Sequence, residues 1–316
     1  MLVLALALAA ALPAAQAQTG KWPSKPVRVI VPFPAGGSTD IVARILAARL
    51  SEEFGQQFVV DNRGGAGGTI GAEIAARAEP DGYTVIVVAS SYVTAAALYK
   101  LPYDPVKGIA PISMTNAGPF ILTVHPSLNV TNLKEFIALA RAKPGALNYG
   151  SSGIGGTLHL AGELFGRMTR TDAVHVPYKG TGPAVFDLIS GRIQFIFANG
   201  PSVLPHIKAN RLRGIAVTTE RRSPLMPDLP TVSELVPGFL AITWHGMLAP
   251  AGTPKPIVTR LNQALAHILK QPDVQGVLHR EGLEAAHSTP EEFGRVIAGD
   301  IARWTKVVEV GNIKVE

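Results

Sequence analysis

The sequence predicts an α/β protein of two lobes, each built around a parallel β-sheet. Two series of alternating strands and helices indicate this class, because the helices that follow the strands cover both faces of a parallel sheet. The length of 316 residues favours two lobes, since a single hydrophobic core stops growing near this size. Two apolar segments, Ile109–Val124 and Phe239–Ala249, are interpreted as the crossings between the lobes.

The first series has the order strand, helix, strand, helix, strand. Its first strand is rich in β-branched residues, and the apolar residues of the helix that follows fall on one face. The expected elements are strand Val27–Val31, helix Thr39–Phe54, strand Phe58–Val60, helix Ile70–Ala78 and strand Tyr83–Ala89.

The second series contains four helix–strand pairs, and the tail of the chain is expected to be helical. The pairs are Leu133–Ala142 with Leu147–Gly150, Thr157–Met168 with Ala173–Val176, Ala184–Ser190 with Ile193–Phe197, and Val203–Lys208 with Gly214–Thr218. The expected tail helices are Ile257–Leu269, Val274–Arg280 and Pro290–Val308. We therefore expect lobe 1 to combine residues 18–120 with 245–316, and lobe 2 to comprise residues 121–244.

The N-terminus has the pattern of a secretory signal peptide. A short apolar run ends in Ala15-Gln16-Ala17, a small-x-small cleavage pattern, although no Lys or Arg precedes the run. A permanent membrane anchor is the alternative. No later stretch has the ~18 apolar residues of a membrane span. We expect residues 1–17 to be removed near Ala17, and the mature protein to be a soluble protein of the periplasm.

Composition excludes several classes of protein. The chain contains no cysteine, which rules out thiol nucleophiles, disulfides and thiolate metal sites. The net charge is +6, but the basic residues are scattered and lack interleaved aromatic residues, so we expect no nucleic-acid partner. A mild positive field instead helps to attract anionic solutes.

The loop Pro32–Asp40 is the strongest candidate for a binding site. It lies between a predicted strand and a predicted helix, and Gly36 and Gly37 allow the backbone to turn tightly and approach a ligand. Ser38 or Thr39 is placed to cap the helix, whose first N–H groups can bind a carboxylate or phosphate. Asp40 is a second cap candidate or a contact for a ligand hydroxyl or amine. A plain strand–helix turn with a cap is the alternative.

The loop Gly150–Thr157 repeats this setting in the second series. Its spacing nearly matches a phosphate-binding loop, but Gly156 stands where the lysine belongs, so we reject nucleotide triphosphate binding. Ser151, Ser152 and Thr157 remain as donors of an anion cradle.

Two further glycine or serine motifs follow predicted strands. Gly65, Gly67 and Gly71 are spaced one residue too widely for a dinucleotide fingerprint, so a flexible turn is the better interpretation. Ser90 and Ser91 follow a strand at the sheet edge where α/β proteins bind ligands.

Catalytic and metal-binding patterns are absent from the sequence. It contains neither a G-x-S-x-G nor an H-E-x-x-H motif, and the eight histidines are dispersed, so we expect no enzyme activity, metal or cofactor. His159 lies within an apolar helical stretch, which favours a structural role. Tyr178, at the end of a strand, is a candidate donor to a carboxylate.

A set of motifs in order makes the chain similar to a known family. They are Lys25-Pro26, Val31-Pro-Phe33, Gly36-Gly37, Asp40-Ile-Val-Ala-Arg44, Asn62-Arg63, Gly65-Ala-Gly-Gly68, Pro80-Asp-Gly-Tyr83, Leu101-Pro-Tyr-Asp104, His159-Leu-Ala-Gly-Glu163, His175-Val-Pro-Tyr-Lys-Gly180, Leu204-Pro-His-Ile-Lys208 and Leu248-Ala-Pro-Ala-Gly-Thr253. The chain resembles the Bug family, the substrate-binding proteins associated with tripartite tricarboxylate transporters.

The resemblance implies a type II periplasmic-binding-protein fold, which closes over its ligand like a Venus flytrap. It also implies small carboxylate ligands and a monomer. The loop matching Phe33–Asp40, including Ala35, holds one carboxylate together with ordered water. Loops matching Ser90 with Ser91, Ser151–Thr157 and Tyr178 complete the cleft.

Two positions depart from the family pattern, and one of them bears on the ligand. Ala198, before Asn199, stands where members often carry aspartate, which removes a partner for an ammonium or hydroxyl group. We therefore favour a di- or tricarboxylate or an aromatic acid over an amino acid. Gly64 stands where proline is usual.

Three functions are compatible with these features. The favoured one is a periplasmic solute-binding protein that delivers a carboxylate to membrane transporter subunits. A ligand-sensing module for a membrane receptor would use the same cleft. A periplasmic hydrolase would need a nucleophile and base that converge on the cleft, and the sequence shows no such pair.

Overall fold

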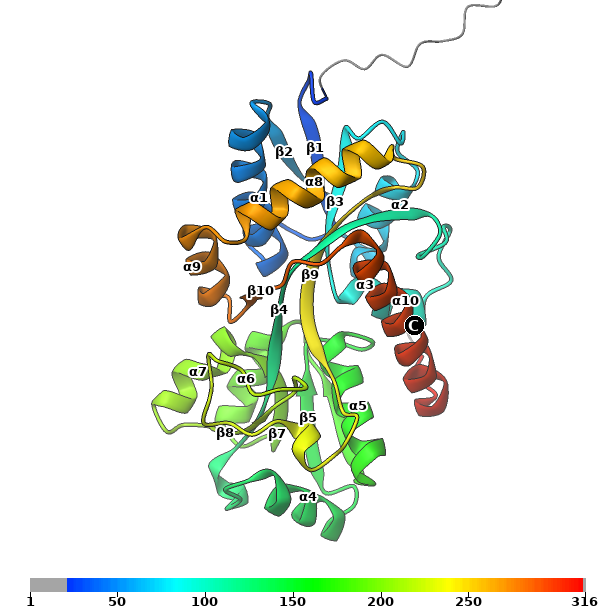
Figure 1. Cartoon of the computed structure of the whole chain (residues 1–316). Coiled ribbons are helices and arrows are strands. Elements are labelled where there is room, and N and C mark those ends of the chain that lie inside the picture. Colours follow the sequence, from blue (N-terminus) through cyan, green and yellow to red (C-terminus); the bar gives the residue numbers. More distant parts are fainter. Residues whose placement is uncertain (1–21, 315–316) are drawn as a thin grey trace, which may run out of the picture.

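The computed structural model describes residues 22–314, so the predicted signal peptide lies outside the described residues. Its strands pair in the order β2-β1-β3-β9-β4-β7-β5-β6, and β10 and β8 are both added to β4. Figure 1 shows the result, two α/β lobes joined by long central strands. The prediction of a two-lobed α/β protein is confirmed.

Each lobe contains a triplet of parallel strands. In lobe 1, β1 (Val27–Val31) lies between β2 (Phe58–Asn62) and β3 (Thr84–Ala89). In lobe 2, β5 (Leu147–Ser151) lies between β6 (Ala173–Pro177) and β7 (Phe195–Asn199). The carboxyl ends of both triplets face the gap between the lobes, where α/β sheets bind their ligands (Figure 1).

Long antiparallel strands connect the lobes. β4 (Ile109–Val124) pairs with β9 (Ile242–Pro250) through residues 109–119 and with β7 through residues 120–124. β8 (Arg213–Val217) and the short β10 (Glu284–Ala285) also pair with β4. Register shifts interrupt these ladders, and such bulges bend and twist a strand so that one strand can serve both sheets.

Helices cover both faces of each sheet. In lobe 1, α1 (Ser38–Phe54), α8 (Lys255–Ile268) and α9 (Pro272–Arg280) share one core, and α2 (Thr69–Ala76) and α3 (Ser91–Leu98) cover the other face. In lobe 2, α4 (Leu133–Ala142) and α5 (Thr157–Thr169) lie opposite α6 (Thr181–Ile189) and α7 (Gly200–Lys208). Short 3-10 turns occur at Ala66–Gly68, Pro126–Leu128 and Val232–Glu234.

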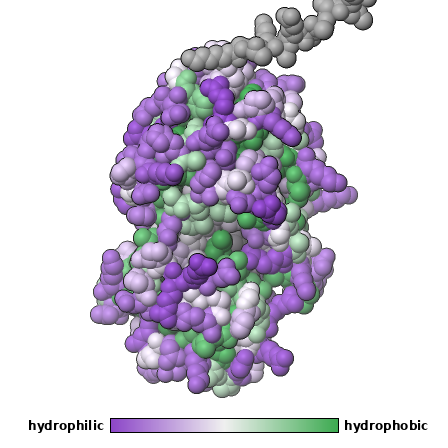
Figure 2. All heavy atoms as spheres, viewed as in Figure 1, coloured by the Kyte–Doolittle hydropathy of each residue, from purple (hydrophilic) through white to green (hydrophobic). Residues whose placement is uncertain are grey.

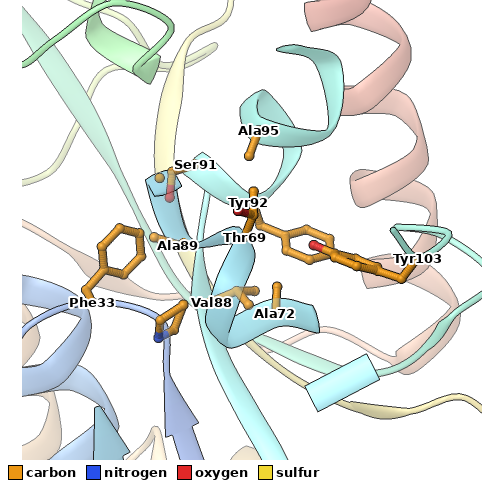
Figure 3. Close-up of a pocket in the computed structure, with 12 residues that line it drawn as sticks. Phe33, Thr69, Ala72, Val88, Ala89, Ser91, Tyr92, Ala95 and Tyr103 are labelled. Carbon is orange, nitrogen blue, oxygen red and sulfur yellow. The ribbon is translucent and has the colours of Figure 1, made fainter. Parts of the chain in front are cut away.

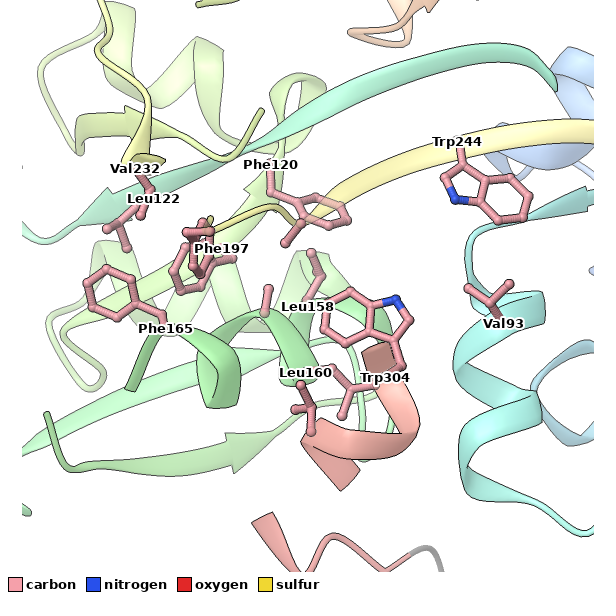
Figure 4. Close-up of a cluster of buried hydrophobic side chains, with 14 of the residues drawn as sticks. Val93, Phe120, Leu122, Leu158, Leu160, Phe165, Phe197, Val232, Trp244 and Trp304 are labelled. Atoms are coloured by element: carbon pink, nitrogen blue, oxygen red, sulfur yellow. The ribbon is translucent and has the colours of Figure 1, made fainter. Parts of the chain in front are cut away.

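The C-terminal helix α10 (Pro290–Gly311), which we expected to belong to lobe 1, contacts both lobes. It packs against α3 in lobe 1 and α5 in lobe 2. Trp304 of α10 is buried in a core that runs through both lobes, and Figure 4 shows it beside Leu158 and Leu160 of α5. Arg303 donates to the carbonyl of Leu240 at 2.9 Å. The helix is thus a third link between the lobes.

Several predicted boundaries differ from the structure. α6 and α7 begin three residues earlier than expected, with Pro183 and Pro201 inside their first turns. Proline is tolerated there because the N–H groups of a first turn have no partner within the helix. The helix α3, directly after Ser90, was not predicted. The strand predicted at Ile193–Phe197 lies two residues later, at Phe195–Asn199.

None of the helices within residues 22–314 is long and apolar enough to span a membrane.

Candidate ligand-binding site

A cavity of about 250 Å³ lies between the lobes. The surface is hollowed between the two halves of the molecule in the space-filling view (Figure 2). Residues of both lobes and of the connecting strands line the cavity. They are Phe33, Ser38, Thr39, Ala89, Ser90, Ser91, Phe120, Ser152, Gly156, Thr157, Leu158, Thr181, Asn199, Thr243, His245, Glu281 and Leu283.

Five helices begin at this cavity. Its lining includes the first residue or the N-cap residue of α1, α3, α5, α6 and α7. None of these five N-termini has a side-chain cap, which is also true of α2, α8 and α9 elsewhere, whereas α4 and α10 are capped by Asn132 and Thr289. Free N–H groups and the positive end of each helix dipole therefore face the cavity. This arrangement suits an anion without any cationic side chain.

Asp40 holds the loop of the lobe 1 wall in shape. Its Oδ2 accepts from the Gly36 N–H at 2.9 Å and from Arg44 Nε at 2.8 Å, and its Oδ1 accepts from Asn62 Nδ2 at 2.9 Å. Asn62 Nδ2 also donates to the Phe33 carbonyl at 3.0 Å. Asp40 is buried and does not line the cavity. Its carboxylate supports the loop from within.

The same contacts set the charge of Asp40. Burial raises the pKa of this carboxyl group, but hydrogen bonds from Arg44, the Gly36 N–H and Asn62 overcome that effect and leave the pKa below its ordinary value. Asp40 is therefore ionised throughout the physiological pH range.

A buried polar cluster supports the lobe 2 wall. Ser151 Oγ lies 2.7 Å from His175 Nε2. It also donates to the Gly153 carbonyl at 3.0 Å and accepts from the Gly153 N–H at 3.2 Å. His159 Nδ1 accepts from the Gly155 N–H at 3.0 Å. Burial lowers the pKa of both His159 and His175 to about 4, so both imidazoles are neutral at pH 7. The structural role predicted for His159 agrees with this packing.

Two other predicted site residues, Tyr178 and Ala198, do not line the cavity. Tyr178 donates its hydroxyl to Asp187 at 2.8 Å, and burial together with this hydrogen bond raises the pKa of Tyr178 to about 12. Ala198 is fully buried in the core beneath α6 and α7. Because neighbouring residues of a strand face opposite sides, Asn199 reaches the cavity instead.

The predicted site residues thus divide into two groups. Those that line the cavity are Phe33, Ser38, Thr39, Ser90, Ser91, Ser152, Thr157 and Asn199. Those that do not line it are Ala35, Gly36, Gly37, Asp40, Ser151, Tyr178 and Ala198. In the second group, Ala35, Gly36 and Gly37 are exposed and Ala198 is buried. The side chains of Asp40, Ser151 and Tyr178 are hydrogen-bonded within the protein.

Sequence reasoning missed the part of the lining that comes from distant segments. Thr243 and His245 lie on β9, and Glu281 and Leu283 follow α9. Thr181 was missed because the start of α6 was expected later. A helix predicted to begin directly after Gly180 would have included Thr181 at its start. The segments on β9 and after α9 carried no local signal of a binding site.

His245 is a neutral, oriented group in the cavity. Its Nδ1 lies 2.8 Å from Asn116 Oδ1, which can only accept, so Nδ1 carries the proton and Nε2 has a free lone pair. Burial lowers the pKa of His245 to about 4.

Two buried polar atoms on opposite walls have no partner within residues 22–314. They are Ser91 Oγ in lobe 1 and Asn199 Oδ1 in lobe 2, and both residues line the cavity. An unpaired buried polar atom costs free energy, which a ligand or water that bonds to it recovers.

A second pocket lies behind Phe33, between β3, α2 and α3 (Figure 3). It encloses about 10 Å³, which is room for one water at most. Within the described part of the chain, no cluster of histidine and carboxylate side chains is arranged to hold a metal ion. The cavity of about 250 Å³ is the candidate ligand site because it lies between the lobes and five helices begin at it.

Comparison with known proteins identifies the family. The model of the family described as "tripartite tricarboxylate transporter family receptor" matches residues 42–313. The chain belongs to this family. The receptor family consists of periplasmic solute-binding proteins, so the resemblance to Bug proteins and the periplasmic-binding-protein fold are both confirmed.

Three relatives illustrate how close the match to the receptor family is. BugT of Bordetella pertussis strain Tohama I is 36% identical over 318 residues, which cover 99% of this chain and 98% of BugT. A Rhodopseudomonas palustris protein solved with adipate has 40% identity and a TM-score of 0.79, over 93% of this chain and 99% of that one. MatC from Rhodopseudomonas palustris, with bound malate, has 33% identity and a TM-score of 0.75, over 91% and 100% of the two chains.

Proposed function

We propose that this receptor captures a small carboxylate in the cavity between its lobes and delivers it to the membrane subunits of a tripartite tricarboxylate-type transporter. The observation that carries the proposal is the convergence of five uncapped helix N-termini on one cavity. Among the described residues that line this cavity there is no lysine or arginine. An anion would thus be bound by N–H groups, hydroxyls and helix dipoles.

The ligands of two relatives support a carboxylate. The Rhodopseudomonas palustris neighbours were solved with adipate and with malate, both of which are dicarboxylates. The proposed direct contacts in this chain are the hydroxyls of Ser38, Thr39, Ser90, Ser91, Ser152 and Thr157 and the amide of Asn199. Gly36, Gly37 and Asp40, with Ala35, would shape the lobe 1 loop, and Ser151, Tyr178 and Ala198 the lobe 2 wall.

Ligand capture would couple to closure of the lobes. In our proposal lobe 1 comprises residues 18–120 and 245–316, lobe 2 comprises residues 121–244, and they turn about β4 and β9. A ligand held first by one lobe favours the closed state only through the extra contacts it makes with the second. The Ser91 and Asn199 atoms that lack partners lie on opposite walls, so one ligand could bond to both after closure.

We further propose that the protein acts as a monomer in the periplasm, after cleavage near Ala17, and without catalysis. The Ser151–His175 pair resembles a nucleophile and its base, but Ser151 is fully buried and neither residue lines the cavity. A hydrolytic role would need that serine to reach the substrate.

The direct test is a binding screen. Purified protein is mixed with mono-, di- and tricarboxylates, and binding is measured by thermal shift and then by calorimetry. We expect at least one carboxylate to bind, and Ser152→Trp, which fills the cavity, to abolish its binding. Ala138→Trp, on the exposed face of α4, is the matched control and should bind normally. If no carboxylate binds the unmodified protein, the proposed ligand class is wrong.

The transport role is tested in cells by deleting the gene. We expect loss of uptake of the carboxylate identified in the screen. Normal uptake, combined with loss of a transcriptional response to the same carboxylate, would overturn the transport role and indicate a sensor.

A further inference from the structure

The end of the cavity next to α9 differs from the rest of its lining. Glu281, directly after α9, is partly buried and lines the cavity there. Among the lining residues within 22–314 it is the one acidic side chain, and the lining contains no lysine or arginine. A cavity suited to an anion therefore has one acidic end.

Glu281 and Asn199 belong to the same end, although they come from opposite lobes. The residues that follow them, Gly282 and Gly200, are in close contact. A β-carbon on Gly282 would lie 3.6 Å from the α-carbon of Gly200 and 3.0 Å from Cδ of Pro201. The turn after α9 thus packs against the first turn of α7, and both Glu281 and Asn199 line the cavity.

Both side chains offer acceptors that no protein group uses. Within residues 22–314, the Glu281 carboxylate makes no hydrogen bond or ion pair, and the buried Asn199 Oδ1 has no partner. His245 adds a third acceptor to the lining, since its Nε2 keeps a lone pair. A hydrogen-bond donor on the ligand would satisfy these acceptors.

Resting on the proposed function, we propose that Glu281 and Asn199 bind a hydrogen-bond-donating substituent of the carboxylate ligand, an ammonium or a hydroxyl group. The carboxylate itself would lie at the helix N-termini, and the substituent would point to the α9 end. This makes Glu281 a residue that determines ligand specificity.

The acidic side chain of Glu281 determines which ligand substituent is favoured at this end of the cavity. A second ligand carboxylate near Glu281 would be repelled, and an ammonium would be attracted, because water screens charges less in a partly buried cavity than in bulk solvent. The sequence suggested the opposite preference, because Ala198 lacks the family's aspartate. Glu281 would supply the missing negative charge from a different segment of the chain.

The experiment uses acids that share a carbon skeleton and differ at carbon 2. The sets are succinate, malate and aspartate; glutarate, 2-hydroxyglutarate and glutamate; and 3-phenylpropionate, phenyllactate and phenylalanine. A thermal-shift screen of the unmodified protein identifies the skeleton that binds best. Calorimetry then gives the dissociation constants of that set for the unmodified protein, Glu281→Gln, Glu281→Lys and the control Glu79→Gln, an exposed glutamate outside the cavity.

The unmodified protein should bind the 2-amino or 2-hydroxy acid about tenfold or more tightly than the unsubstituted acid, a difference of about 1.4 kcal/mol. Glu281→Gln should reduce this ratio by about tenfold for the amino acid, and Glu281→Lys should reverse it. Glu79→Gln should leave it unchanged. Binding of the unsubstituted acid verifies that each variant is folded.

Each outcome has one meaning. If the unsubstituted acid binds as tightly as its partners, or if Glu281→Gln leaves the ratio unchanged, the inference is wrong while the proposed function stands. If no acid binds the unmodified protein, the proposed function fails, and the inference fails with it.

Discussion

The imidazole rings of His159 and His175 stack with their centroids 3.8 Å apart, beneath the loop that forms the lobe 2 wall of the cavity. Their planes differ by 12°, and His159 Nδ1 accepts from the N–H of Gly155 in that loop. Protonation of His159 would remove this acceptor and place a charge against His175. The shape of the loop therefore depends on both imidazoles staying neutral.

Stability should fall as the pH is lowered from about 6.5 toward 4. Burial lowers the folded-state pKa of His159, His175 and His245 to about 4, from an ordinary value of 6.5. The unfolded chain then binds more protons than the folded chain in this window, so stability is complete above 6.5 and declines below it. Each histidine contributes a slope of at most about 1.4 kcal/mol per pH unit, which urea unfolding at several pH values measures.

The variant His159→Gln isolates part of this effect. It should decrease the slope of the unfolding free energy against pH, between pH 6.5 and 5, by up to about 1.4 kcal/mol per pH unit, which corresponds to one proton. His279→Gln, which changes an exposed histidine of α9, should have the slope of the unmodified protein. A flat stability profile for the unmodified protein across this window would contradict the prediction.

Asp40→Asn should destabilise the protein and weaken carboxylate binding together. The two carboxylate oxygens of Asp40 accept from Gly36, Arg44 and Asn62, and asparagine would leave a single oxygen acceptor. A buried group that loses its hydrogen-bond partner costs about 1–3 kcal/mol. Arg44→Gln should cost less than about 1 kcal/mol, because the Arg44 side chain is 54% exposed. Chemical denaturation and calorimetry of both variants test this order, and equal losses would disprove it.

Gly246 of β9 is in contact with α10 and has no room for a side chain. A β-carbon there would overlap the ring of the buried Phe293. Gly246→Ala should therefore lower the free energy of unfolding by about 1–3 kcal/mol. Gly299→Ala, where a β-carbon meets open space on the same helix as Phe293, should raise it by up to about 1 kcal/mol. Thermal or urea unfolding should show opposite signs for the two alanines.

Trp304 secures α10 to both lobes. It is 1% exposed, and Trp304→Ala should cost about 3–5 kcal/mol because the substitution leaves a large cavity. Val310→Ala, near the end of the same helix, changes a side chain that is 60% exposed and should stay within about 0.5 kcal/mol. Unfolding curves with similar midpoints for the two variants would show that α10 is not held through Trp304.

Local patterns in the sequence were sufficient for most elements of the fold. The strand Val27–Val31, the helix Leu133–Ala142 and the start of the last helix at Pro290 have the same bounds in the structure as in the prediction. Hydrophobic periodicity and turn residues act over a few positions, so the chain shows them directly. The strand–loop–helix settings of Ser38 and Ser152 were predicted for the same reason.

The tertiary structure decided which residues meet at the cavity. Glu281 and His245 reach it from segments far from the serine-rich loops, through the pairing of β10 and β9 with β4. It also decided that Asp40 and Ala198 face inward while Ser38 and Asn199 face the cavity. Orientation and burial result from packing between segments distant in the sequence, and no local pattern in the sequence encodes those contacts.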